Sequence, residues 1–223
     1  MKRIRTVLYV LMFSPSVVTA LVFGFLPERI PAHYGFDGMV TRYGSRWEAF
    51  IFPLATIGFG FFMLFMARFS RKHESEGNHN NEKVLLISAI VFMIVFNVLT
   101  LHSLYTSYKQ VDDLYSATDP MRMIFSLLGL SFVVVGNFMP KLKRNSIMGL
   151  RTKWSLSSDE AWRKSQRFGG ISFIVTGVLL VVGNVFLFTS IRSFFCSLAL
   201  ILITVVVCVI YSYRVAQIPK DRT

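Results

Sequence analysis

Two histidines and three aspartates have the side chains best suited to hold a cation or a basic peptide: His33, Asp37, His102, Asp112 and Asp113. Imidazole and carboxylate groups bind metal ions, but metal sites follow recurring ligand spacings, and these five residues show none. The simpler expectation is that His33 is hydrogen-bonded within a loop, His102 lies at a membrane interface and the aspartates are solvated. Peptide recognition by these acids and the nearby aromatic residues is favoured over metal binding.

The remaining residues show no pattern that is typical of a catalytic site. The sequence contains no P-loop, HExxH, GxSxG or Rossmann pattern. Cys196 and Cys208 share one apolar segment, where twelve residues of helix would separate them by about 18 Å, too far for a disulfide. His73 and His79 lie in a polar loop and are expected to be solvated. We therefore expect no enzyme activity, no cofactor and no metal.

The elements that must position these residues are membrane helices. Six windows of 18 to 25 residues carry no Asp, Glu, Lys or Arg, and a spanning helix needs about 20 mostly apolar residues. This pattern excludes a soluble domain and a secreted disulfide scaffold, and it disfavours a barrel of alternating strands. The sequence predicts an all-α integral membrane protein, a single polytopic domain with six transmembrane helices at about 7–26, 48–67, 84–105, 120–140, 169–189 and 194–213.

The charge distribution predicts the orientation of these helices. With the amino terminus inside, the inner segments hold eighteen Lys and Arg and the outer segments six, while the twelve acids divide equally. The whole net charge of +12 then falls inside, as the positive-inside rule requires, so both termini are expected to be cytoplasmic. Anionic lipid headgroups explain the basicity better than nucleic acid. Residues 18–20 resemble a signal cleavage site, but the apolar run continues to Leu26, so we expect a retained helix.

Two connecting segments contain more sequence information than ordinary linkers. The outer loop at 27–47 is rich in aromatic residues and turn signals, which predicts a small packed cap ending in a Ser45–Glu48 capping box. In the inner segment at 141–168, Ser157 and Glu160 predict a second capping box. Residues 158–168 predict a short amphipathic helix on the inner membrane surface, with Trp162 embedded in lipid and a polar face made of Asp159, Glu160, Arg163, Lys164, Gln166 and Arg167.

A short repeat also suggests how the helices pack. VVGN occurs at 134–137 and at 181–184, so Gly136 and Gly183 allow close helix approach and Asn137 and Asn184 can bond across helices. Small-residue packing is favoured over an internal duplication. The spans themselves lack the ionisable residues that pumps and coupled transporters place at membrane depth, which argues against coupled transport.

Two stretches resemble the signatures of one family. IPAHYGFDGMVTRYGS, at 30–45, is similar to the outer-loop signature of the SdpI family of bacterial toxin-immunity membrane proteins. The segment at 136–170 resembles the second signature of that family more closely, through Asn145, Gly149-Leu150-Arg151-Thr152, Trp154, Ser157-Ser158, Trp162 and Arg163-Lys164. Departures from the family pattern are Gly35, Thr41, Lys153, Ser155 and Gln166.

The resemblance implies a non-enzymatic role in a bacterial plasma membrane. Family members protect a cell from a membrane-active peptide toxin, and the best-known arrangement also holds a cytoplasmic autorepressor at the membrane. Toxin recognition would involve the outer residues His33, Tyr34, Asp37, Tyr43 and Trp47. Docking of a cytoplasmic partner, or of anionic headgroups, would involve the inner residues Asn145, Arg151, Thr152, Trp154, Trp162, Arg163 and Lys164. A purely structural role of the inner motif is an equal alternative.

Two other functions stay open from the sequence. The first is an envelope-stress or lipid-state sensor without immunity, which would use the inner motif as its docking site. The second, a small-molecule transporter or lipid-modifying enzyme, is less favoured because the spans hold no charged residue. No direct binding of nucleic acid is expected.

Overall fold

The protein is described here by a computed structural model that covers residues 1–72, 80–145 and 147–217. Within these ranges six helices are long and apolar enough to cross a membrane: Lys2–Phe25, Arg46–Lys72, Asn80–Lys109, Pro120–Lys141, Asp159–Leu187 and Ser190–Ala216. The predicted all-α membrane protein with six spans is therefore confirmed. His73 and His79 lie outside the described residues.

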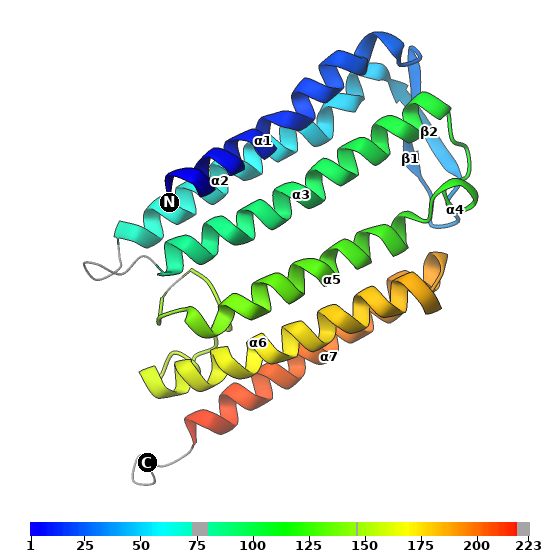
Figure 1. The fold of residues 1–223 in the computed structure, drawn as a ribbon. Helices are drawn as coiled ribbons and strands as arrows, with labels where there is room; N and C mark the ends of the chain where they lie inside the picture. Colours follow the sequence, from blue (N-terminus) through cyan, green and yellow to red (C-terminus); the bar gives the residue numbers. More distant parts are fainter. Residues whose placement is uncertain (73–79, 146, 218–223) are drawn as a thin grey trace.

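The helices form two groups of three (Figure 1). The first group contains α1 (Lys2–Val22), α2 (Ile51–Lys72) and α3 (Asn80–Lys109). The second contains α5 (Pro120–Phe138), α6 (Asp159–Val182) and α7 (Ser190–Ala216). The two groups meet along α3 and α5. Short turns continue several helices: η1 (Phe23–Phe25), η2 (Arg46–Phe50), η3 (Met139–Lys141) and the π-turn η4 (Gly183–Leu187).

The first group is held by a core of apolar side chains. Leu8 and Met12 of α1 pack with Leu86, Ala89 and Met93 of α3, and all five are fully buried. Such interdigitation, rather than hydrophobic exclusion from water, drives helix association inside a bilayer. Polar side chains add specific links, because Asn97 of α3 donates to the carbonyl oxygen of Leu11 at 2.8 Å and accepts from Ser14 at 2.7 Å.

The second group depends on glycines. A Cβ atom on Gly136 would lie 2.6 Å from the carbonyl oxygen of Gly170, and one on Gly129 would lie 2.7 Å from that of Gly177. The backbones of α5 and α6 therefore touch at two levels, as small residues permit. This confirms the close approach expected at Gly136. Gly183 instead lies against the ring of Phe188.

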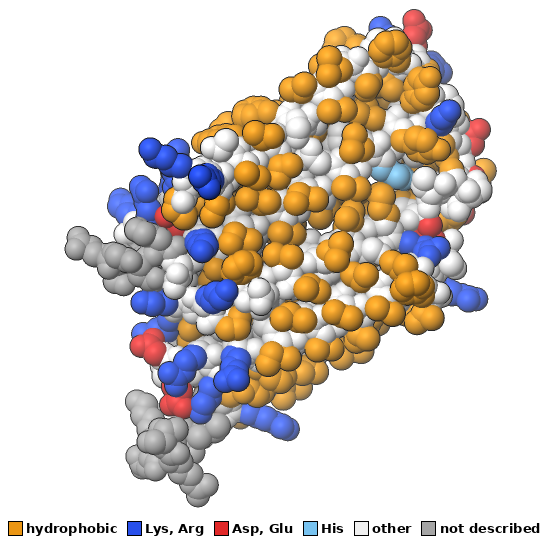
Figure 2. Space-filling model, viewed as in Figure 1, with side chains coloured by type: hydrophobic (Ala, Val, Ile, Leu, Met, Phe, Trp, Pro, Cys, Tyr) orange, Lys and Arg blue, Asp and Glu red, His pale blue; other side chains and the backbone are white. Residues whose placement is uncertain are grey.

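A β-hairpin closes one end of the molecule. Strands β1 (Arg29–Tyr34) and β2 (Val40–Ser45) pair antiparallel, and the turn between them has Gly38 at a φ of +83°, which favours glycine. The loop after α3 and the short helix α4 (Leu114–Ala117) lie beside the hairpin. We call this end the hairpin end, and the opposite end, where α1 begins and α7 ends, the basic end. Figure 2 shows Lys and Arg side chains gathered at the basic end and an apolar surface between the ends.

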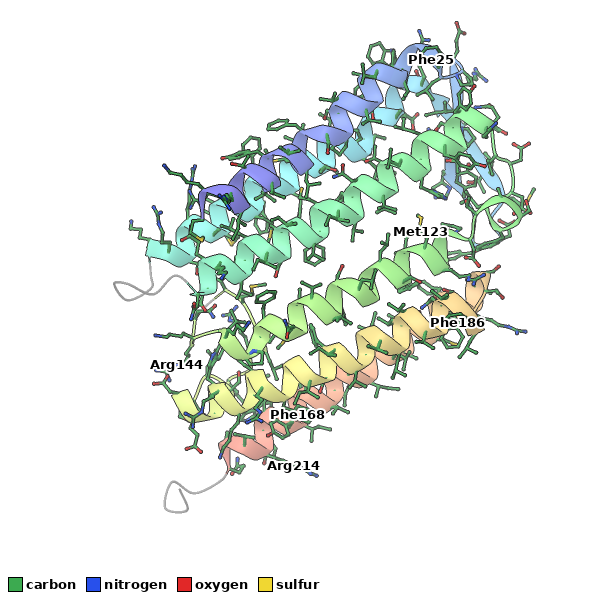
Figure 3. The ribbon with its side chains drawn as sticks, viewed as in Figure 1. Phe25, Met123, Arg144, Phe168, Phe186 and Arg214 are labelled. Carbon is green, nitrogen blue, oxygen red and sulfur yellow. The ribbon has the colours of Figure 1, made fainter. Side chains whose placement is uncertain are left out.

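One predicted element is wrong. Residues 158–168 do not form a separate surface helix in the described part of the chain, because α6 continues unbroken through Gly169 and Gly170 to Val182. Its N-cap is Ser158, whose hydroxyl accepts from Ala161 N at 3.0 Å, and not Ser157. Glycine does not end the helix here because both glycines are buried, and Gly170 makes the close contact with α5. Figure 3 shows Phe168 at this continuous part of α6.

Candidate functional site

The hairpin is attached to the loop after α3 by backbone and tyrosine hydrogen bonds. Val40 N donates to Asp112 O at 3.0 Å, and Leu114 N donates to Gly38 O at 2.9 Å. The hydroxyl of Tyr34 donates to Val111 O at 2.9 Å, and that of Tyr115 donates to Phe36 O at 3.0 Å. We call the unit of residues 29–45 and 110–118 the hairpin cap. The packed outer cap expected from the sequence is therefore present, although it also needs the second loop.

Tyr43 and Asp112 form the most polar contact of the hairpin cap. The Tyr43 hydroxyl donates a short hydrogen bond to Asp112 Oδ1. This bond is the main reason that the pKa of Tyr43 is raised above 10.0, because the neighbouring carboxylate favours the protonated phenol. The pKa of Tyr34 is also raised, chiefly because the side chain is partly buried.

The other acidic residues and histidines of the hairpin end also have protein partners. Asp37 accepts from Met39 N at 3.0 Å, and Asp113 caps α4 by accepting from Tyr115 N at 2.9 Å. His33 Nδ1 lies 2.6 Å from the hydroxyl of Thr41, and His102 Nε2 lies 2.7 Å from that of Thr118. Among the residues that the structure describes, no three His, Cys, Asp or Glu side chains come together as a metal site would require.

Four of the five predicted toxin-contacting residues are exposed. His33, Asp37 and Tyr43 lie on the hairpin, and Trp47 lies just beyond it with 66% of its surface accessible. Trp47 packs against Phe23 at 4.5 Å between ring centroids, so it belongs to the side of the cap next to α1. The fifth residue, Tyr34, is half-buried and uses its hydroxyl to hold the cap together.

The strand ends of the hairpin border an open hollow. Glu28, Arg29, Ser45 and Arg46 line a space of about 370 Å³. Glu48 accepts from the backbone of Ser45, as one half of the predicted capping box requires, whereas the hydroxyl of Ser45 accepts from Trp47 N at 3.5 Å instead of from Glu48 N. Glu48 also pairs with Arg42 at 2.7 Å. The hairpin end thus offers exposed aromatic rings and charges of both signs.

At the basic end, several residues of the inner motif form the structure of the loop itself. Asn145 accepts from Ile147 N at 2.8 Å and Met148 N at 2.7 Å, which fixes a turn. The hydroxyl of Thr152 lies 2.9 Å from that of Ser212 in α7. The ring of Trp154 meets Tyr213 edge-on at 5.1 Å between centroids.

Contrary to the prediction, Trp162 is not embedded in lipid. Its side chain is 2% exposed, and its indole nitrogen donates to Leu142 O at 2.8 Å. It packs with Met139 and Leu142 and with Val84 of α3. The apolar face of this part of α6 meets the protein because the preceding loop folds back over it, and Trp162 therefore has a structural role.

Gln166 is a residue whose role the sequence reasoning missed. It was expected on a solvated polar face, but it is 1% exposed and its side chain forms hydrogen bonds with both backbone groups of Leu150. Gln166 Oε1 accepts from Leu150 N and Nε2 donates to Leu150 O, each at 3.0 Å. A Cβ atom on Gly149 would collide with this amide, and the φ of +101° at Gly149 also requires glycine. The glycine two positions before Arg151 was the available signal for a tight loop.

The charged residues of the inner motif remain accessible. Arg151 and Arg163 are exposed, whereas Lys164 pairs with Glu160 at 2.6 Å. Arg144 pairs with Asp159 at 3.1 Å, and Figure 3 shows it at this end. The candidate docking set therefore divides into half-buried or buried residues that shape the loop and exposed cations that can meet a partner.

Two buried polar side chains inside the molecule, Glu82 and Asn184, form further contacts, of which the sequence reasoning missed the first and expected the second. Arg5 of α1 forms an ion pair of 2.5 Å with Glu82, which is 1% exposed and lies two residues before a charge-free window. Asn184 is fully buried and donates to Ser197 of α7 at 2.9 Å, as the expected cross-helix bond requires. Its counterpart in the repeat, Asn137, is exposed.

Two parts of the chain match models of known protein families. Residues 141–212 match the model of the SdpI/YfhL protein family, and residues 10–57 match a domain of unknown function, DUF1648. The first match covers the inner motif, α6 and most of α7, and the second covers most of α1, the hairpin and the start of α2. No solved structure matches the chain.

A curated relative extends the similarity to almost the whole chain. The chain is 22% identical over 215 residues to the immunity protein SdpI of Bacillus subtilis (strain 168), which covers 94% of this chain and 95% of that protein. The similarity therefore includes both the hairpin cap and the loop at the basic end. Together with the family match over 141–212, it confirms the resemblance to the SdpI family that the two sequence signatures predicted.

Proposed function

We propose that this protein is an immunity protein that protects a bacterial cell against an antimicrobial peptide toxin. The observation that carries the proposal is the similarity to an immunity protein over 94% of the chain. In the proposed orientation the basic end faces the cytoplasm and the hairpin cap faces outward, where a toxin arrives. The protein would act by binding, without a chemical step.

The hairpin cap is the proposed site of toxin contact. Its exposed side chains combine a tyrosine, an aspartate and a histidine, with the exposed Trp47 beside it, and aromatic residues dominate the energetics of many protein interfaces. The cap is also pre-formed, because the hydroxyl groups of Tyr34 and Tyr115 join its hairpin to its second segment, the loop after α3. A rigid surface loses less entropy on binding than a flexible loop does.

The test is survival of a toxin-sensitive bacterium that expresses the protein, compared with empty vector at verified membrane levels. We expect protection from the wild-type chain, loss of protection with Asp37→Ala or Tyr43→Ala, and retention with Tyr108→Ala, an exposed tyrosine of α3 outside the cap. Protection that survives both cap substitutions would move the site away from the cap. No protection from the wild-type protein would overturn immunity.

A second function, signalling to a cytoplasmic partner, is favoured by the exposed cations at the basic end. Arg151, Lys153 and Arg163 are exposed there, so they are available to an acidic repressor surface. A toxin-dependent reporter tests this role. Arg151→Ala should abolish the reporter response while survival persists, whereas loss of both at normal protein level would place Arg151 in the protective mechanism. A response without any protection would support a sensor alone.

A further inference from the structure

A cavity beside Arg151 lies within the second helix group at the basic end. It measures about 200 Å³ and is lined by helix residues that include Val135, Met139, Phe173, Val205 and Cys208. Its remaining wall is the segment around Gly149 and Arg151. The cavity therefore reaches from the apolar part of three helices to the charged loop.

Several features keep this cavity open. Gly169 has no side chain, and a Cβ atom there would lie 2.9 Å from Met139 Cε and 3.7 Å from the side chain of Leu150. Gln166 holds Leu150 by both backbone groups and so fixes the loop over the cavity. The space is thus part of the fold, held by specific bonds.

The side chains that line the cavity favour a hydrocarbon ligand. Apart from Arg151, the lining side chains are apolar or a thiol, and Met139 and Cys208 are almost fully buried. An apolar cavity of about 150 Å³ can stay dry and bind a guest the size of benzene. Val205 is 50% exposed as well as lining the cavity, so the cavity adjoins the surface of α7 that faces the bilayer.

The positive charge at the basic end favours a ligand with an anionic group next to its hydrocarbon chain. The segment 141–167 carries eight Lys and Arg but two acids, and those acids pair with Arg144 and Lys164. Within the described residues no carboxylate lies in ion-pair distance of Arg151, which is exposed at the edge of the cavity. An arginine guanidinium matches the geometry of a phosphate group.

We propose that this cavity holds part of an acyl chain of one anionic phospholipid whose phosphate contacts Arg151. The lipid would enter beside Val205 from the inner leaflet and would stabilise the loop of the inner motif. This proposal does not rest on immunity, since it concerns lipid binding by the protein alone. It gives Arg151 a defined ligand in place of a general attraction to headgroups.

Native mass spectrometry of the full chain in neutral detergent tests the proposal. Phosphatidylglycerol is the probe, with phosphatidylcholine and inorganic phosphate as separate arms. We expect one tightly held phosphatidylglycerol, which Val205→Phe removes by filling the cavity and Val206→Phe retains. Val206 is a matched control because it is the next residue of α7, is 55% exposed and does not line the cavity. Arg151→Gln should weaken binding at least about tenfold, and Arg163→Gln should not.

Three outcomes of these binding measurements would overturn the proposal. Equal retention by Val205→Phe and Val206→Phe would mean that lipid does not occupy the cavity, and equal weakening by Arg151→Gln and Arg163→Gln would mean diffuse attraction. Displacement of the lipid by phosphate alone would identify a free anion as the ligand.

A fluorescence measurement tests the same site. In a Trp47→Phe/Trp154→Phe background, phosphatidylglycerol with brominated chains should quench the fluorescence of Trp162, which packs on cavity residues Met139 and Leu142. Absence of saturable quenching would also contradict the proposal, without relying on a cavity variant.

Discussion

Single side chains join segments that are distant in the sequence. Tyr43 of β2 reaches Asp112, which lies 69 positions later, and Gln166 of α6 holds Leu150 of the preceding loop. Tyr43 makes this bond from within a paired strand, whereas Gln166 supplies hydrogen-bond partners to a residue that lies outside any helix or strand. Loss of such a side chain is therefore expected to act on a whole segment, and two predictions follow at this scale.

Tyr43 should titrate above the ordinary value for tyrosine. Because the bond to Asp112 raises its pKa above 10.0, the link is fully present below pH 10 and is lost as the pH rises through the raised pKa. The difference in tyrosinate absorbance between wild type and Tyr43→Phe should reveal this group. Asp112→Asn, which removes the charge, should move the titration downward. A Tyr43 that ionises at pH 10 or below in the wild type would contradict the bond.

Gln166→Ala should destabilise the basic end. The change leaves Leu150 N–H without its partner, at about 1–3 kcal/mol for a group left unsatisfied, while Leu150 C=O loses one of two donors and keeps the hydroxyl of Ser155 at 2.7 Å. Thermal unfolding in detergent micelles measures the loss. Arg167→Ala is the control, since Arg167 is the next residue of α6 and is exposed. Equal stability of the two variants would show that the bonds to Leu150 are not needed.

At the scale of elements, α5 and α6 are the most closely approached helices. Their contact uses Gly129 and Gly136 against Gly177 and Gly170, so two backbones touch where side chains usually stand between them. By contrast, a Cβ atom added to Gly58 of α2 would have no neighbouring atom within 4 Å. Gly136 and Gly58 are therefore expected to respond differently to alanine.

Gly136→Ala should lower the free energy of unfolding, and Gly58→Ala should not. The added methyl group at position 136 would lie 2.6 Å from a carbonyl oxygen of α6, and such overpacking costs about 1–3 kcal/mol. At position 58 alanine meets no neighbour and gains helix propensity of up to about 1 kcal/mol. Unfolding with denaturant in micelles compares the two variants. A Gly136→Ala variant as stable as wild type would contradict the close approach.

At the scale of the whole molecule, the hairpin cap links the two helix groups. The hairpin follows α1 in the chain, and the ring of Phe36 at its turn meets Phe194 of α7 edge-on at 6.5 Å between centroids. At the other end, Lys143 N donates to Asn81 of α3 at 3.0 Å. The groups are thus joined at both ends as well as along α3 and α5.

The orientation can be measured with single cysteines in a background without Cys196 and Cys208. Thr41 on the hairpin and Lys153 at the basic end are both exposed. We expect a membrane-impermeant maleimide to label Thr41→Cys in intact cells and Lys153→Cys after permeabilisation. The physical reason is the concentration of Lys and Arg at the basic end, which favours the cytoplasmic side. The opposite labelling pattern would reverse the orientation proposed for the toxin site.

The sequence by itself determined the number of helices able to span a membrane, because burial in lipid demands long uncharged segments that composition alone reveals. It also indicated the family resemblance and the packed loop at 27–47, through turn signals and aromatic residues. These features depend on residues close together in the chain.

Only the tertiary structure decided which side of each element meets protein and which meets lipid or water. An amphipathic pattern at 158–168 fits a surface helix as well as a helix covered by its own loop, and the burial of Trp162 and Gln166 selects the second. The cavity beside Arg151 likewise arises from three helices and a loop that are separate in sequence. The physical reason is that periodicity shows a helix to have two faces, whereas only packing shows what covers each face.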